Sequence, residues 1–221
     1  MGRVSVVLSR QPDAVARCGQ AQPGAELHLM VLAIDRHSCA GVDLGSGALV
    51  RAWTPEPVDK RLRPYDVVAG TLGADADVVP DPAEPEAVAL AGPLRPFGHL
   101  TGRKAQRYLR PLLHPPEEHL LGLAGPDVLF WERSTEHPSI ALVEPETATV
   151  IVRRRRWLDC RFGWRGHRVE LPVLDRWIAA ALARSGQTRM VAGLGDRLVV
   201  ALTAPIDGRC HKVVAAVLPR P

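Results

Sequence analysis

An arginine-rich stretch in the last third of the chain contains the residue types that bind polyanions. Its sequence, RRRRWLDCRFGWRGHRVE at residues 153–170, holds seven arginines and three large aromatic residues. Guanidinium groups neutralise phosphates and aromatic rings stack on bases, so the combination is typical of proteins that bind single-stranded nucleic acid. The stretch therefore carries the main functional prediction of the sequence.

We expect its arginines to contact phosphates and its tryptophans or histidine to stack on bases. These candidate interface residues are Arg153, Arg154, Arg155, Arg156, Trp157, Arg161, Trp164, Arg165, His167 and Arg168. An earlier stretch, TGRKAQRYLRPLL, predicts a short helix with Thr101 as its N-cap and a basic face. We expect that face to extend the basic track through Arg103, Lys104 and Arg107.

The elements that would position these residues set limits on them. RFGWRGHRVELPV predicts a hairpin with Arg165 and Gly166 at its turn. Phe162 and Trp164 lie two residues apart and share one strand face, so core burial of both rings is an alternative to stacking. Successive arginines in a strand point to opposite faces, and burying them unpaired would be costly. We therefore expect residues 153–156 at a sheet edge or barrel mouth.

The charge of the chain is unevenly distributed along its length. The 221 residues carry 28 basic and 24 acidic side chains, a net of +4. Residues 1–150 hold 14 basic and 19 acidic groups, whereas residues 151–221 hold 14 and 5. This asymmetry indicates an anionic partner for the rear part. A solubilising arginine-rich surface, partly paired with the acidic front part, is the alternative.

Short apolar runs separated by glycine- and proline-rich segments predict a mainly β protein. The run LHLMVLAI from Leu27 predicts a buried strand, and SCAGVDL and ALVRAWTP flank a glycine-rich turn at 45–47 as a hairpin would. YDVVAGTL, GPDVLFWERS and SIALV predict further strands. Residues 1–26 are expected to be a partly ordered arm. The acidic, proline-rich segment 74–87 is expected to be a solvated loop or, alternatively, a flap competing with nucleic acid.

The rear part has the clearest local signals. TATVIVRRRRW and the hairpin predict strands, and a helix should begin at the N-cap Asp175 and end at Gly186. Three further strand-like runs follow, TRMVAGL, DRLVVALT and CHKVVAAVL. Short strands with one helix late in the unit fit a small barrel better than a βαβ fold.

Several of these segments resemble a known family. CAGVDLGSGALVRAWTP with LRPYDVV, and later FGWRGHRVELPVLD with CHKVVAAVL, are similar to the two halves of the bacterial dual OB-containing domain. Leu174-Asp175 departs from the Thr-Asp pair expected there. The resemblance implies two small OB-like β-barrels, each with a short helix, at 27–137 and 138–221, the second basic. It also implies nucleic-acid binding without defined catalytic residues.

Other function classes find little support. The chain has no P-loop, GxSxG or dinucleotide-binding motif, so we expect no catalysis and no cofactor. The four cysteines are far apart. A metal site joining His37 and Cys39 to Cys210 and His211 is the minor alternative to buried thiols. No run is long enough to span a membrane, so we expect a cytoplasmic protein. The alternative functions are a protein-interaction module around Leu129–Trp131 and a nucleotide or small-anion receptor.

Overall fold

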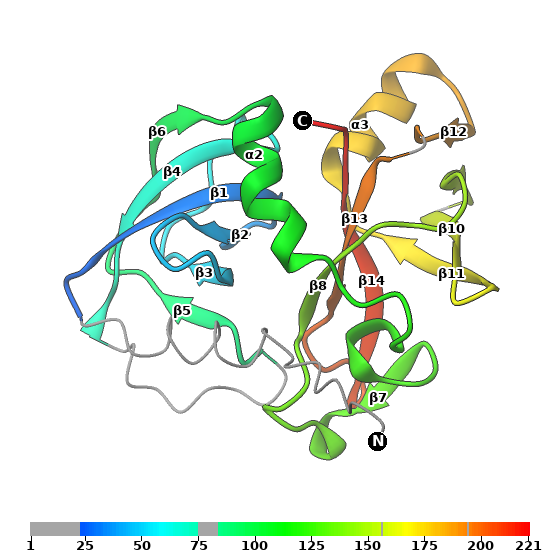
Figure 1. Cartoon of the computed structure of the whole chain (residues 1–221), viewed down its shortest axis with the longest axis horizontal. Coiled ribbons are helices and arrows are strands. Elements are labelled where there is room, and N and C mark those ends of the chain that lie inside the picture. The colour runs from blue at the N-terminus through cyan, green and yellow to red at the C-terminus, as the bar shows by residue number, and fades with distance from the viewer. Residues whose placement is uncertain (1–22, 75–83, 156, 194) are drawn as a thin grey trace, which may run out of the picture.

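The protein is mainly β, with two sheets lying side by side and two short helices in the described residues. The computed structural model describes residues 23–74, 84–155, 157–193 and 195–221. Figure 1 shows the six-stranded sheet in blue, cyan and green beside the eight-stranded sheet, with α2 in front of the junction. None of the helices in the described ranges is long and apolar enough to cross a membrane.

The first sheet is built around β1, whose residues from Leu29 to Ile34 are buried on both faces because the run LMVLAI is apolar. The strand order is β5-β3-β2-β1-β4-β6. β1, β2 and β3 form an antiparallel meander, β3 pairs in parallel with β5, and β4 pairs with β1. The strands are β1 (Glu26–Ile34), β2 (Ser38–Asp43), β3 (Leu49–Trp53), β4 (Asp66–Thr71), β5 (Ala87–Ala89) and β6 (Arg95–His99).

The second sheet repeats part of this connectivity and adds β13 and β8 beyond β14. Its order is β12-β9-β10-β11-β14-β13-β8, and β7 also pairs with β14. β9, β10 and β11 form the meander, and β11 pairs in parallel with β14, as β3 does with β5. The strands are β7 (Asp127–Leu129), β8 (Ile140–Val143), β9 (Val150–Arg153), β10 (Leu158–Trp164), β11 (His167–Val173), β12 (Arg189–Val191), β13 (Arg197–Leu202) and β14 (Arg209–Leu218).

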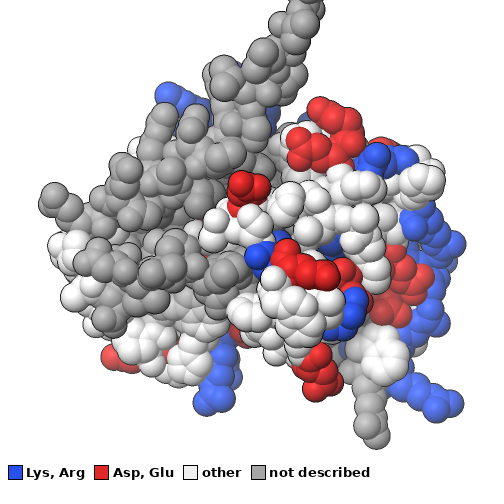
Figure 2. Space-filling view, turned by 90° about the horizontal axis from the view of Figure 1, so that it is seen from below, with Lys and Arg blue, Asp and Glu red and all other residues white. Residues whose placement is uncertain are grey.

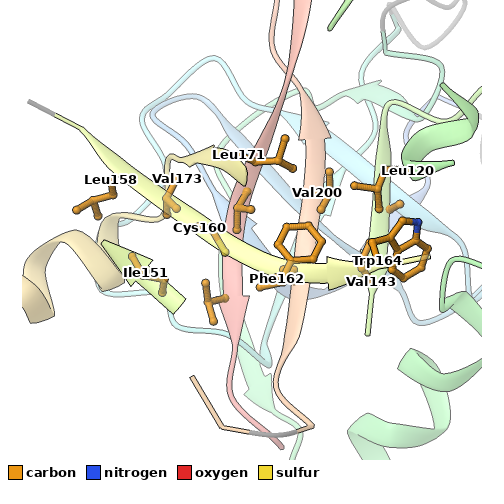
Figure 3. Packing of buried hydrophobic residues seen from close by; sticks show 14 of the residues in the cluster. Leu120, Val143, Ile151, Leu158, Cys160, Phe162, Trp164, Leu171, Val173 and Val200 are labelled. Carbon is orange, nitrogen blue, oxygen red and sulfur yellow. The ribbon is translucent and has the colours of Figure 1, made fainter. Parts of the chain in front are cut away.

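The β10–β11 hairpin turns where the sequence predicted. Trp164 pairs with His167, and the two residues between them, Arg165 and Gly166, have φ values of 56° and 71°. Two consecutive residues with positive φ form the type I′ turn, which matches the twist of an antiparallel pair. Figure 3 shows Phe162 and Trp164 on the inner side of β10, packed with core residues such as Leu171 and Val200.

The helices follow their predicted start and stop signals closely. α3 (Arg176–Ser185) begins after Asp175, whose Oδ1 accepts hydrogen bonds from the backbone N–H groups of Trp177 and Ile178 at 2.8 and 3.0 Å. It ends at Gly186, which has a left-handed conformation. α2 (Gly102–Leu109) begins after Thr101, but the Thr101 side chain makes no capping hydrogen bond.

Three buried clusters hold the molecule together. One lies inside each half, and the third lies between the halves. β1 shows how the clusters share a strand, because Leu29 and Val31 face the core of the first half whereas Met30 and Leu32 face the cluster between the halves. That cluster also takes Leu142 from β8 and residues of β13, β14 and α2. The two sheets are therefore joined by a continuous apolar interface.

Candidate nucleic-acid interface

The outer face of β9, β10, β11 and β12 is not covered by another described element. Residues alternate along β10, so that Leu158, Cys160 and Phe162 point into the core while Asp159 and Arg161 point outward. The strand register aligns the outward residues in rows. Val150 lies opposite Arg161, and Gly163 lies opposite Arg168.

Three arginines surround an apolar floor on this face. Arg189 of β12 lies opposite Val152 of β9. Arg161 stands on β10, the next strand, and Arg168 stands on β11 beyond it. Together with Val150 and Val152 they line a hollow of about 510 Å³. We call this surface the arginine face, defined by Val150, Val152, Arg161, Arg168 and Arg189.

One end of the hollow is walled by the segment between β8 and β9. The hydroxyl of Thr147 accepts a hydrogen bond from the Gly163 N–H at 2.9 Å, and a Cβ at Gly163 would lie 2.8 Å from Thr147 Cγ2. The Glu146 carboxylate accepts hydrogen bonds from the Arg165 and Gly166 N–H groups at 2.7 and 2.9 Å. Glycine at 163 thus allows the wall to approach the sheet, and the wall anchors the hairpin turn.

Two of the candidate arginines are paired with carboxylates. Arg161 donates from Nε and Nη2 to Glu170 at 3.0 and 3.1 Å, and Arg154 donates from Nε to Asp159 at 2.9 Å. The hydrogen bond from Arg161 lowers the pKa of Glu170, and the hydrogen bond to Asp159 raises the pKa of Arg154. These two guanidinium groups are therefore partly neutralised within the face.

Other candidate arginines are exposed and have no carboxylate partner among the described residues. Arg153 at the end of β9 and Arg155 in the connection to β10 are exposed at strand ends, and Arg168 stands on the arginine face beside Arg189, which is exposed as well but was not among the candidates. Arg156 lies outside the described residues. Basic side chains line the right-hand edge of Figure 2, on the side where Figure 1 places β10 and β11, with acidic side chains beside them.

The two candidate tryptophans have opposite environments. Trp157 directly precedes β10 and is 59% exposed, so its indole is accessible for stacking. Trp164 is 4% exposed, and its Nε1 donates to the Glu118 carbonyl at 2.9 Å. The core alternative holds for Trp164, and its assignment as a stacking residue is wrong because the inner side of β10 is packed. His167 is exposed and lines the hollow.

The remaining predicted residues do not join the arginine face. Arg165 reaches away from the hollow, with its Nη1 2.7 Å from Nδ1 of His119. The α2 residues Arg103, Lys104 and Arg107 are exposed, but α2 packs between the halves through Ala105 and Leu109 and none of the three lines the hollow. Sequence reasoning missed Arg189, because its run TRMVAGL predicted a strand without indicating that β12 pairs with β9.

The described cysteines have the environment of core thiols. Cys39, Cys160 and Cys210 are buried, and burial raises the pKa of Cys39 and of Cys160 to about 12. Cys39 packs in the core of the first half and Cys210 in that of the second, so they do not form the joint metal site. Within residues 23–74, 84–155, 157–193 and 195–221, no cluster of three or more His, Cys, Asp or Glu side chains is placed to hold a metal ion.

No protein-family model, curated protein or solved structure matches the chain. Its function is therefore inferred from its own residues and geometry.

Proposed function

We propose that the protein binds single-stranded nucleic acid across the arginine face. The observation that carries this proposal is an uncovered sheet face on which Arg161, Arg168 and Arg189 surround a hollow with an apolar floor. A basic groove with adjacent aromatic rings is the usual binding surface for single strands. In this chain the ring is Trp157, at the end of the same sheet.

The strand connectivity supports an OB-like fold around each sheet, although neither sheet closes into a barrel in the described residues and β7, which precedes residue 138, pairs with β14 of the second sheet. In both halves a three-stranded meander is followed by a strand that pairs in parallel with its third member. In the first half, an antiparallel bridge between Leu72 and Leu90 also links the end of β4 to the residue after β5. OB folds bind oligonucleotides on the face of strands 2 and 3 and through the loop between strands 1 and 2. In the second half these correspond to β10, β11 and the connection bearing Arg153, Arg155 and Trp157.

Different side chains of this surface would contact the phosphates, the sugars and the bases. Arg168 and Arg189 would contact phosphates, since neither has a described carboxylate partner, whereas Arg161 must exchange part of its bond to Glu170 for a phosphate. The valine floor would contact sugars and base edges. Trp157 would stack on an unpaired base, which a duplex does not offer.

Fluorescence anisotropy with labelled oligonucleotides at several salt concentrations tests this proposal. The variant changes Arg153, Arg155, Arg168 and Arg189 to Gln. The control changes four exposed bases of the α2 region, Arg103, Lys104, Arg107 and Arg110, to Gln and removes the same charge. Binding to single strands depends on salt with a slope of about −0.7 per phosphate contact, so the first variant should flatten the slope by roughly 2 to 3. Equal losses in both folded variants would contradict the proposal.

A protein-interaction role is the second candidate, supported by one exposed aromatic residue. Trp131 is 70% exposed, and a Cβ at Gly208 would lie 3.0 Å from its Cζ3 atom, so the indole rests against the β13–β14 turn near the exposed Ile206. Exposed apolar patches of this kind mark interaction sites. Loss of a co-purifying protein or of self-association on changing Trp131 and Ile206 to Ser would favour this role. Size-exclusion chromatography and pull-down measure it.

A further inference from the structure

A second hollow lies where the eight-stranded sheet splits. β11 and β14 pair only at Val173 and Val214 among the described residues, and they separate toward the β10–β11 turn. A hollow of about 330 Å³ occupies the split, and the segment from His119 to Pro126 forms one of its sides. The inner faces of Val169 and Leu171 and the ring of Trp164 form another side.

A buried lysine lines this hollow. Lys212 of β14 is 4% exposed, its N–H donates to the Pro126 carbonyl at 2.8 Å, and its Nζ donates to the Leu123 carbonyl. An ammonium group has three donor hydrogens, and no second acceptor for them is found among the described residues. Burial lowers the pKa of Lys212 to about 8, opposed by the nearby Asp127 carboxylate. A buried cation with one neutral acceptor would gain from an anionic partner.

Further donors stand around the entrance. Arg165, His119 and His167 are exposed and line the hollow. Nη1 of Arg165 contacts both ring nitrogens of His119, at 2.7 and 3.0 Å, which leaves the other donors of Arg165 available. Glu170 also lines the hollow, but its carboxylate is held by Arg161.

The covering segment has an unusual backbone that places its carbonyl on the lysine. Leu121 is fully buried with a φ of 59°, and Gly122 follows with a φ of 70°. A Cβ at Gly122 would lie 2.6 Å from Nδ1 of His137. Left-handed conformations of bulky residues are costly and cluster at ligand sites and active sites. Two consecutive positive φ values bring the chain back so that Leu123 meets Lys212.

From this geometry we propose that the hollow between β11 and β14 binds a phosphate monoester. Lys212 supplies a buried positive charge, and Arg165 and His167 supply donors at the entrance. The site goes beyond the arginine face and does not depend on it. The monoester can come from a free nucleotide or from the terminal phosphate of a bound strand, because His167 lines both hollows.

Isothermal titration calorimetry with uridine 5′-monophosphate, with uridine as the unphosphorylated control, tests the site. Uridine 5′-monophosphate should bind and uridine should not. Lys212→Met and Arg165→Asn should each raise the Kd about tenfold or more, because each removes a charge-assisted hydrogen bond. Asn tolerates the left-handed conformation of residue 165, so the turn is kept. Arg103→Gln on α2 is the matched control and should leave the Kd unchanged.

Equal affinity for the nucleoside and the nucleotide, no binding of the nucleotide, or an unchanged Kd in Arg165→Asn would overturn the proposal. If Lys212→Met fails to fold, Arg165→Asn decides, because its side chain is exposed.

Oligonucleotides with and without a terminal phosphate distinguish the sources of the monoester. A preference for the 5′- or 3′-phosphorylated strand that Arg165→Asn abolishes would assign the site to strand ends. Nucleotide binding without such a preference would assign it to free nucleotides.

The two proposals fail independently. Nucleotide binding without any oligonucleotide binding would support the hollow and sink the proposed function. Binding of oligonucleotides without binding of the nucleotide, and without a preference for strands with a terminal phosphate, would contradict only the proposed phosphate site.

Discussion

The two halves share a three-stranded meander with a parallel strand beside it but use the same sheet face in opposite ways. In the first half the outer face of the meander carries Ala40, Val42 and Leu49, which pack against Val199 and Val213 of the second half. In the second half the outer face of the meander is open and carries arginines. The difference shows that two halves with similar strands need not have the same binding surface, because in the first half this face is buried against the second half.

The comparison extends to the charged residues on these faces. Arg51 of β3 is buried and paired with Glu84, and the same carboxylate accepts a hydrogen bond from Trp53 Nε1 at 2.9 Å. In the second half, Arg168 and Arg189 are exposed without described carboxylate partners, and the Trp157 ring is exposed. The same residue types are therefore held by a carboxylate in one half and stand without one on an accessible surface in the other.

Placing an arginine on each face should give the largest contrast. Leu49→Arg puts a charge without a partner into the cluster between the halves and should cost about 5 kcal/mol or more of unfolding free energy. Val152→Arg lies on the open face and should change stability by less than about 1 kcal/mol. Thermal and denaturant unfolding measure both. Similar losses in the two variants would show that the arginine face is covered.

Removing one tryptophan from each half should separate binding from structure. Trp157→Ala should weaken oligonucleotide binding about tenfold with little change in Tm, because a stacked base contributes roughly 1–3 kcal/mol. Trp53→Ala should lower Tm through the lost hydrogen bond to Glu84 and leave binding unchanged. Anisotropy and thermal unfolding of both variants provide the comparison. If only Trp53→Ala weakened oligonucleotide binding, the interface would lie in the first half, and the proposed assignment would be wrong.

The buried cations of the halves should differ in their pH dependence. Arg51 has a carboxylate partner, whereas Lys212 donates to a carbonyl and has a pKa of about 8 instead of 10.5. At pH values between 8 and 10.5, Lys212 is protonated in more of the unfolded chains than of the folded molecules. Its contribution to stability therefore increases as pH rises from 8 to 10.5. Urea unfolding of the wild type and Lys212→Met should show that the unfolding free energy of the wild type increases relative to that of the variant across this range. Parallel curves would contradict a buried ammonium.

The smallest effect is expected from releasing the paired arginines. Glu170→Gln removes the carboxylate that holds Arg161 and Arg154 and should strengthen oligonucleotide binding about two- to fivefold, as one repulsive charge is lost from the face. The unfolding free energy should hardly change, because the pair is exposed. Anisotropy at low and high salt checks this. Weaker binding in the variant would mean that Glu170 positions Arg161 for the ligand.

The local signals in the sequence were accurate where one segment determines its own structure. The turn at Arg165 and Gly166 and the helix from Asp175 to Gly186 were confirmed, since both depend on φ preferences and capping within a few residues. The mainly β class was confirmed as well. The strand β6 was missed, because Pro96 and Gly98 within it are poor strand formers.

The candidate site was less predictable because it depends on which face another segment covers. Alternation places Phe162 and Trp164 together but gives the same pattern whether that face is open or buried. The structure buries it and leaves Arg161 and Arg168 outside. The pairing of β9 with β12, which brings Arg189 to the face, joins segments more than 30 residues apart and has no local sequence signal.

Two-dimensional NMR titration with a single-stranded oligonucleotide tests the central claim most directly, because it maps the contact surface residue by residue. The account predicts shifts of the backbone amides of Val150–Val152, Arg161–Arg168 and Arg189–Val191 and of the Trp157 indole. The amides of β1, β2 and β3 should remain in place. Shifts concentrated in those three strands, with the amides of β9–β12 unchanged, would contradict it.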